Sequence, residues 1–243
     1  MQYAVLTEIG LRNRNEDSAY IPIGVCGAPV VAVADGMGGH RAGCVASELA
    51  VHSIVEYIEG APLATSDERL INEAVKAANR AVHTLASNSS EYNGMGTTIV
   101  AALLYPDRFI AANVGDSRIY HYDGDKLVLV SHDHSLVAEL VEIGAITMEQ
   151  ARTHPYRNMI TRALGTDENA RVDVFSCIWN RGDTLLLCSD GLHGYVSDER
   201  MADIMGLEID LAEMGGMLVK AALENGSSDN ITVVLARNSE ADQ

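Results

Sequence analysis

The sequence predicts an α+β layered sandwich, in which antiparallel β-sheets are covered by pairs of helices. Short apolar runs rich in β-branched residues are joined by turns of two or three residues, and longer segments with helical spacing of apolar residues lie between them. Connections that short join antiparallel neighbours, so a doubly wound parallel sheet fits less well. A chain of 243 residues can bury a substantial core, and it contains no repeat or linker. We therefore expect one domain over residues 1–243.

The first third of the chain predicts two strands followed by two helices. Tyr3–Thr7 and Pro29–Ala34 are apolar runs typical of buried strands. Residues 41–59 carry apolar side chains at helical spacing and end at a glycine and a proline. Residues 68–86 repeat this pattern with a clear apolar stripe. Two successive helices of this kind are expected to cover one face of a sheet.

A series of β-rich runs comes next, and their tight connections predict an antiparallel meander. These runs are Thr97–Leu104, Phe109–Val114, Ser117–Tyr122 and Leu127–Ser131. Helical character returns in Ser135–Arg152, which we interpret as an insertion between strands. The remaining expected elements are strands at Val172–Phe175, Thr184–Cys188 and Ile231–Ala236, and helices at Ser197–Met205 and Leu211–Leu223.

The net charge and the cysteine content argue against several classes of function. The 34 acidic residues against 17 basic ones give a net charge of −17, which repels nucleic acid and anionic membranes. Four widely spaced cysteines without a CxxC pair favour free thiols in a reducing compartment. No apolar stretch is long enough for a membrane span. We expect a cytoplasmic monomer that binds neither nucleic acid nor membrane.

Carboxylates adjoin several of the expected strands. Asp35, Asp116 and Asp190 each follow an apolar run and have a glycine neighbour, and Asp229 precedes Ile231–Ala236. A single aspartate in such a place is usually a turn or cap residue. Four of them together would repel one another unless a cation lies among them, and hard oxygen ligands suit Mg²⁺ or Mn²⁺ better than Zn²⁺. The sequence therefore predicts a two-metal site at the edge of a β-sandwich.

Six ordered motifs resemble those of the metal-dependent protein phosphatases of the type 2C (PPM) family, especially its compact bacterial members. The motifs are RNRNED at residues 12–17, ADGMGGH at 34–40, GMGTT at 94–98, VGDSR at 114–118, SDGL at 189–192 and SDNIT at 228–232. They span nearly the whole chain. The resemblance implies a four-layer α-β-β-α sandwich, with two antiparallel sheets between helix pairs and a flap at about residues 135–164.

The resemblance also implies the ligands of two Mn²⁺ or Mg²⁺ ions. Asp35 matches the bridging carboxylate, the Gly36 carbonyl matches a ligand of one ion, and Asp190 and Asp229 match ligands of the other. Asp116 matches a residue that, with the one matching Asp190, holds a third and weaker ion. In such a site, hydroxide held between the two ions attacks phosphorus.

Three further residues take their expected roles from the resemblance. Glu16 and Asp17 match acidic residues that orient water around the metals, although a solvated turn is the simpler alternative. Arg12 matches the arginine that binds the substrate phosphate, a task for which the planar guanidinium is suited. Arg14 is the nearby alternative, but the distance to Glu16 favours Arg12.

The proton donor for the leaving group stays open. Some family members have histidine where this chain has Met37, and a thioether cannot donate a proton. His40 is one alternative, with an unperturbed pKa that suits the task, although a histidine at the start of a helix is more often a surface residue. Water on a third ion at Asp116 is the other.

These observations predict hydrolysis of phosphoserine and phosphothreonine in proteins, with phosphorylated proteins and a cognate Ser/Thr kinase as partners. One alternative is a phosphoprotein-binding module on the same fold, which Met37 alone favours. Another is an acidic Ca²⁺-binding structural protein, but the sequence lacks an EF-hand loop.

Overall fold

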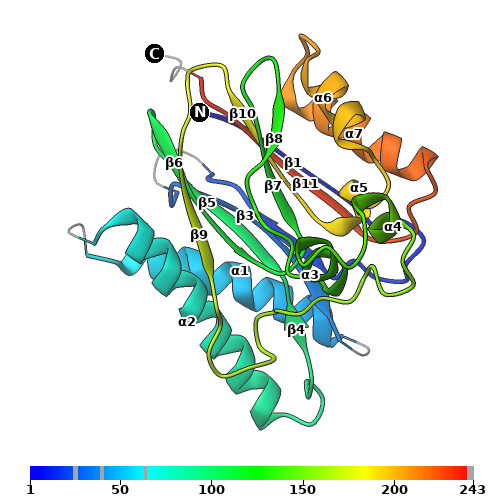
Figure 1. Ribbon diagram of the computed structural model, residues 1–243. Coiled ribbons are helices and arrows are strands. Elements are labelled where there is room, and N and C mark those ends of the chain that lie inside the picture. The colour runs from blue at the N-terminus through cyan, green and yellow to red at the C-terminus, as the bar shows by residue number, and fades with distance from the viewer. Residues whose placement is uncertain (24–26, 39–40, 63–64, 240–243) are drawn as a thin grey trace.

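The computed structural model describes residues 1–23, 27–38, 41–62 and 65–239. Two antiparallel sheets pack face to face in this part of the chain (Figure 1). The first has the order β1 (Gln2–Glu8), β11 (Ile231–Arg237), β10 (Thr184–Cys188), β7 (Arg118–Tyr122) and β8 (Leu127–Leu129). The second has the order β2 (Asp17–Tyr20), β3 (Val30–Met37), β5 (Ile99–Leu104), β6 (Arg108–Val114) and β9 (Asp173–Ile178), with β4 (Gly96–Thr97) paired to the end of β3.

Helices cover the outer face of each sheet. The long helices α1 (Ala42–Gly60) and α2 (Asp67–Asn88) lie on the second sheet, and α6 (Asp198–Met205) and α7 (Leu211–Glu224) lie on the first (Figure 1). This arrangement confirms the expected α-β-β-α sandwich.

Strand β3 shows why the two sheets form a single body. Its side chains alternate between the two faces, as in any strand. Val31 and Val33 enter the core between the sheets, whereas Val30, Ala32 and Ala34 enter the core beneath α1 and α2. All five are fully buried. A continuous apolar run is therefore the pattern of a strand that is covered on both sides.

Two sequence-based expectations are wrong, and one strand was missed. The missed strand is β2, whose segment DSAY is short and polar and forms a strand by pairing with β3. Strand β3 continues through Asp35 to Met37, so Asp35 lies within the strand and not after it. The four runs after α2 form no continuous meander, since β5–β6 belong to one sheet and β7–β8 to the other. The chain crosses between the sheets at Gly115, whose φ of 110° is in the region that favours glycine.

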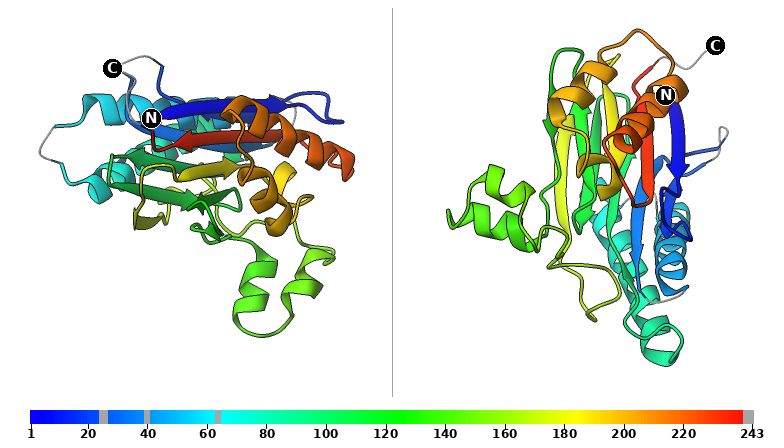
Figure 2. Two further views of the ribbon diagram at one scale, coloured as in Figure 1. Left: turned by 90° about the horizontal axis from the view of Figure 1, so that it is seen from above. Right: turned by 90° about the vertical axis from the view of Figure 1, so that its right-hand side faces the viewer.

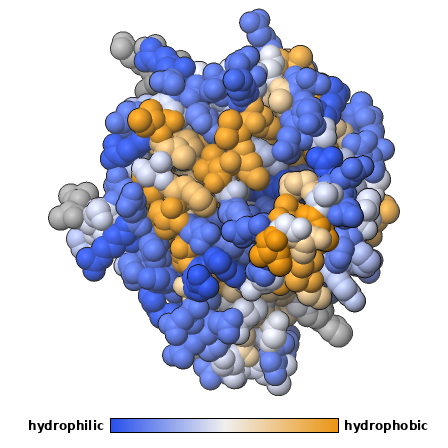
Figure 3. Space-filling view, viewed as in Figure 1, coloured by the Kyte–Doolittle hydropathy of each residue, from blue (hydrophilic) through white to orange (hydrophobic). Residues whose placement is uncertain are grey.

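The segment between β8 and β9 leaves the sandwich. Its helices α3 (Leu136–Glu142) and α4 (Met148–Arg152) project from the body of the molecule (Figure 2). Its base is closed by hydrogen bonds from Leu136 N to Met159 O (2.8 Å) and from Thr161 N to His134 O (2.8 Å). Apolar side chains gather where α3 lies in Figure 3. The exposed ones on this segment include Ile143, Met148, Tyr156 and Met159.

Among the described residues, none of the helices combines the length and the apolarity that crossing a membrane requires.

Candidate metal centre and active site

The structure brings the predicted carboxylates to one end of the sandwich. Asp35 lies near the end of β3, and Asp116 lies where the chain crosses from β6 to β7. Asp190 begins the single-turn helix α5 (Asp190–His193), which follows β10 after one residue, and Asp229 lies two residues before β11. The charges of Asp190, Asp116 and Asp229 contribute to the raised pKa of Asp35, which places these carboxylates close together.

The GMGTT motif holds the backbone of Asp35. Asp35 N donates to Thr98 Oγ1 (2.9 Å), and Asp35 O accepts from Thr98 N (2.9 Å) and from Thr97 Oγ1 (2.9 Å). Both threonines are buried. Such a set of hydrogen bonds fixes the direction in which the Asp35 side chain leaves the strand.

Asp17 is tied to both sheets. It lies opposite Asp35 in the β2–β3 register, and its Oδ2 accepts from Ser189 Oγ (2.7 Å), next to Asp190. Ser189 Oγ in turn accepts from Thr232 N (3.0 Å). Asp17 therefore links the strand that carries Asp35 with the helix that carries Asp190.

The electrostatics of this cluster suit a divalent cation. The pKa is raised to about 7 for Asp17, to about 7 for Asp116 and to about 6 for Asp190, and well above its ordinary value for Asp35. Burial is the largest cause in each case, and the charges of neighbouring carboxylates add to it. The Oδ1 atoms of Asp17 and Asp190 are buried without a hydrogen-bond partner. Buried, unpartnered carboxylate oxygens are the donor set that Mn²⁺ and Mg²⁺ prefer.

Arg12 and Asp229 form an ion pair at the edge of this cluster. Arg12 NH2 donates to Asp229 Oδ2 at 2.6 Å, and the two side chains are 57% and 27% exposed. This hydrogen bond is the main cause that raises the pKa of Arg12, and the charges of Asp190 and Asp35 add to it. The guanidinium thus lies beside the predicted metal ligands and in contact with solvent, where a phosphate could reach it.

Glu16 and Gly36 lie against one another. Gly36 N donates to Glu16 O (3.1 Å), and a Cβ at Gly36 would collide with the backbone of both Glu16 and Gly43. Burial is the main cause that raises the pKa of Glu16. Only glycine therefore fits at the position whose carbonyl is the predicted ligand.

The structure places Met37, at the position where some family members have histidine, but not His40. Met37 pairs with Gly96 in the β3–β4 ladder, and its Cε lies 2.7 Å from the position that a Cβ of Gly96 would take. It therefore packs against β4. His40 lies outside the described residues.

His193 is a residue of this site that the sequence analysis missed. Its Nε2 donates to Asp116 O (2.9 Å) from α5, so it connects the turn that carries Asp116 to the helix that carries Asp190. Burial is the main cause that lowers its pKa to about 3, and the imidazole is therefore neutral. An isolated histidine after SDGL gives no sequence signal for this contact.

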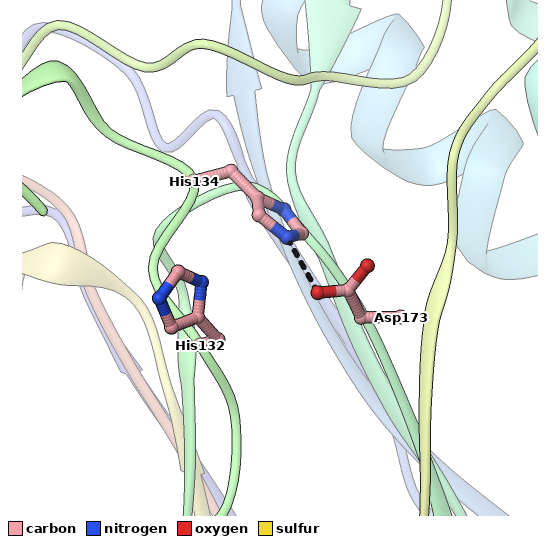
Figure 4. A group of neighbouring side chains, drawn as sticks. All are labelled: His132, His134 and Asp173. Carbon is pink, nitrogen blue, oxygen red and sulfur yellow. Dashed lines mark hydrogen bonds and ion pairs between the residues drawn. The ribbon is translucent and has the colours of Figure 1, made fainter. Parts of the chain in front are cut away.

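A second group of potential ligands lies behind Asp116. The ligand atoms of His132, His134 and Asp173 lie within 4.8 Å of one another (Figure 4). His134 Nδ1 accepts from Gly115 N (3.0 Å), and His134 Nε2 lies 3.0 Å from Asp173 Oδ2 and 2.9 Å from Arg162 NH1. Arg162 NH1 lies 3.0 Å from Asp173 Oδ1. The Arg162 guanidinium already supplies a positive charge to Asp173. This group is therefore better explained as an ion-pair network at the base of the α3–α4 segment than as a metal site.

Comparison with known proteins identifies the family. The sequence profile described as protein phosphatase 2C matches residues 12–225. The chain belongs to the protein phosphatase 2C family. It is 40% identical over 228 residues to the serine/threonine phosphatase stp of Listeria welshimeri, with 93% of this chain and 90% of that protein covered. It is 36% identical over 250 residues to the protein phosphatase PhpP of Streptococcus pneumoniae, with 100% and 99% covered.

Solved structures of this phosphatase family share the fold. The serine/threonine phosphatase Stp1 of Staphylococcus aureus superposes with a TM-score of 0.91 at 37% identity, covering 97% of this chain and 94% of that one. The catalytic domain of the phosphatase PstP, crystallised in complex with two manganese ions, superposes with a TM-score of 0.86 at 36% identity, covering 97% of both chains. These likenesses confirm the predicted family and fold class.

Proposed function

We propose that this phosphatase hydrolyses phosphoserine and phosphothreonine in proteins with the help of two Mn²⁺ or Mg²⁺ ions. The observation that carries the proposal is the cluster of buried carboxylates with raised pKa values, placed beside a solvent-accessible arginine in a chain of the 2C family. The presence of two manganese ions in the PstP structure supports the same metal use here.

The residues present fit such a pair of ions. Asp35 would hold both ions, the Gly36 carbonyl would contact one, and Asp190 and Asp229 would contact the other. Asp116 would hold a third, weaker ion together with Asp190. When bound, a pair of divalent cations activates water and neutralises charge on the phosphoryl group.

The chain's own side chains then bind and orient the substrate. Arg12, which already contacts Asp229, would donate to the phosphate oxygens and keep phosphorus beside the metal ligands. Glu16 and Asp17 would accept hydrogen bonds from water around the ions and keep its orientation. Ser189 and Thr232 hold Asp17 in place for this task.

We further propose that residues 1–243 form one phosphatase domain with a flap at about residues 135–164. The projection of α3 and α4 and the exposed apolar side chains of this segment support a role in contacting the protein substrate. Its base is bonded to His134, which in turn accepts from Gly115 next to Asp116. A substrate held by the flap would therefore lie close to the proposed metal site.

The expected setting is a cytoplasmic monomer that opposes a cognate Ser/Thr kinase. Cys44, Cys177 and Cys188 are free thiols, which fits a reducing compartment. The charge of −17 opposes self-association. Light scattering of the purified protein measures its mass in solution and so tests whether it is a monomer.

The activity is tested with p-nitrophenyl phosphate and a phosphothreonine peptide. We expect hydrolysis of both in Mn²⁺, loss in EDTA and recovery when Mn²⁺ is restored. Asp35→Asn should lower kcat by at least ~10²-fold, whereas Asp125→Asn, which changes an exposed carboxylate on the β7–β8 turn, should not lower it. Turnover that survives EDTA, or that Asp35→Asn leaves intact, would contradict the proposed metal site.

A further inference from the structure

The loop between β1 and β2 presents a second arginine beside Arg12. One side chain fixes this loop, since Asn230 Nδ2 donates to Ile9 O and Arg14 O (both 2.9 Å), and Asn230 Oδ1 accepts from Glu16 N (2.8 Å). Asn230 directly follows Asp229, the residue that Arg12 contacts. The backbone of Arg14 is therefore held at a defined place beside the proposed metal ligands.

A surface hollow of about 380 Å³ opens at this loop, and residues 12–14 line it together with Glu16 and Asn230. The two arginines differ in their interactions with other side chains. Arg12 is paired with Asp229, whereas the Arg14 guanidinium has no hydrogen bond or ion pair within the described ranges and is exposed. The hollow therefore offers a guanidinium that is free to bind an anion.

We propose that Arg14 is a specificity residue that binds a second anionic group of the substrate, either a carboxylate or a second phosphate, near the phosphorylated residue. This inference rests on the proposed function, because it assigns the target phosphate to Arg12. Arg12 and Arg14 are two positions apart, so their Cα atoms are at most about 7 Å apart and both guanidiniums can reach neighbouring residues of one substrate segment. The preferred substrates are then phosphoproteins with an acidic or phosphorylated residue within two positions of the target.

The negative charge of the protein makes Arg14 important for binding an acidic substrate segment. Without this arginine, the carboxylates of a chain with a net charge of −17 would repel an acidic flank of the substrate. Guanidinium binds carboxylate and phosphate through two parallel hydrogen bonds, whereas lysine offers only a point charge. Arg14 would thus turn repulsion of acidic sequences into a preference for them.

The test compares three phosphothreonine peptides that differ only at the second residue after the target, which is alanine, glutamate or phosphoserine. In saturating Mn²⁺ we expect kcat/KM for the glutamate peptide to exceed that for the alanine peptide about fivefold, as for an exposed ion pair of about 1 kcal/mol. The phosphoserine peptide should be favoured more strongly. Arg14→Ala should bring both ratios close to one, and Arg14→Lys should retain part of them.

Arg80→Ala is the matched control, because it removes the same charge from an exposed position on α2. It should leave both ratios unchanged.

The ratios are measured within each variant, so a general loss of activity cannot imitate the effect. Equal kcat/KM values for the three peptides in the unmodified protein would overturn the inference, as would a preference that persists in Arg14→Ala. A preference for the phosphoserine peptide alone would restrict the second anion to phosphate. Failure to hydrolyse even p-nitrophenyl phosphate in Mn²⁺ would instead contradict the proposed function.

Discussion

The metal-free protein should lose stability as the pH rises, and Asp116 should account for a measurable part of this loss. The residue is 8% exposed, and burial, with the charge of Asp190 next in importance, raises its pKa from 3.8 to about 7. The folded protein therefore keeps a proton that the unfolded chain has already released. Between about pH 4 and 7 the folded state binds more protons, so the free energy of unfolding falls as the pH rises through this range.

The size of the effect follows from the pKa shift. At 1.36 kcal/mol per pKa unit, a rise from 3.8 to about 7 corresponds to about 4 kcal/mol. This contribution is present below about pH 4 and is fully lost above about pH 7. Asp116→Asn has no proton to lose, so it should be more stable than the unmodified protein at about pH 8 in EDTA, and the two should converge near pH 4.

Urea unfolding in EDTA at several pH values between about 4 and 8 measures this difference directly. Asp125→Asn is the control and should follow the unmodified protein at every pH. Saturating Mn²⁺ should stabilise the unmodified protein at about pH 8 more than Asp116→Asn, because the variant lacks a ligand. The reasoning is refuted if Asp116→Asn shows the same pH dependence as the unmodified protein, or if it is the less stable of the two at about pH 8 in EDTA.

Further substitutions test the other parts of the site. Asp35→Asn and Asp190→Asn should each lower kcat by at least ~10²-fold with the fold intact by circular dichroism, and near-normal turnover in Mn²⁺ would remove that residue from the site. Arg12→Ala should lower kcat/KM by about 1.5–3 kcal/mol, the range for hydrogen bonds to charged groups, when the variant is assayed at an Mn²⁺ concentration that saturates it, and an unchanged kcat/KM would exclude Arg12 from phosphate binding. Asp116→Ala should impair phosphopeptide turnover at least ~10-fold more than that of p-nitrophenyl phosphate, because only the alkoxide leaving group needs a proton, and equal losses would argue against a role in that step. His193→Leu should lower the free energy of unfolding by about 1–3 kcal/mol, since it leaves a buried carbonyl without its donor, and an unchanged urea midpoint would exclude that contribution.

The ion-pair network of His134, Arg162 and Asp173 has a structural consequence for the site. His134 receives the Gly115 N–H on one ring nitrogen and faces Asp173 with the other, and Arg162 comes from the base of the α3–α4 segment. The turn before Asp116 is therefore bonded to the segment that we propose as a flap. Gly115 could not be replaced without strain, since its φ is positive and a Cβ would collide with Thr98.

The sequence alone determined the elements whose pattern does not depend on their neighbours. Runs such as PVVAVA and TLLLC predict buried strands because apolar residues on both faces require cover on both faces, and the strands β3 and β10 confirm them. The carboxylates of the proposed metal site could also be predicted from sequence, because a cation needs several of them and each has a recognisable motif around it. Their presence at one end of the sandwich follows from the order of the strands.

Only the tertiary structure decided the features that depend on pairing between distant segments. DSAY becomes strand β2 because β3 supplies its hydrogen bonds, and this register places Asp17 opposite Asp35. The crossing at Gly115 could not be distinguished from a hairpin, since a two-residue turn permits both and the packing of the two sheets decides between them. The contact between His193 and the Asp116 carbonyl joins residues 77 positions apart. Such contacts arise when two sheets pack face to face, and the local sequence around either residue does not predict them.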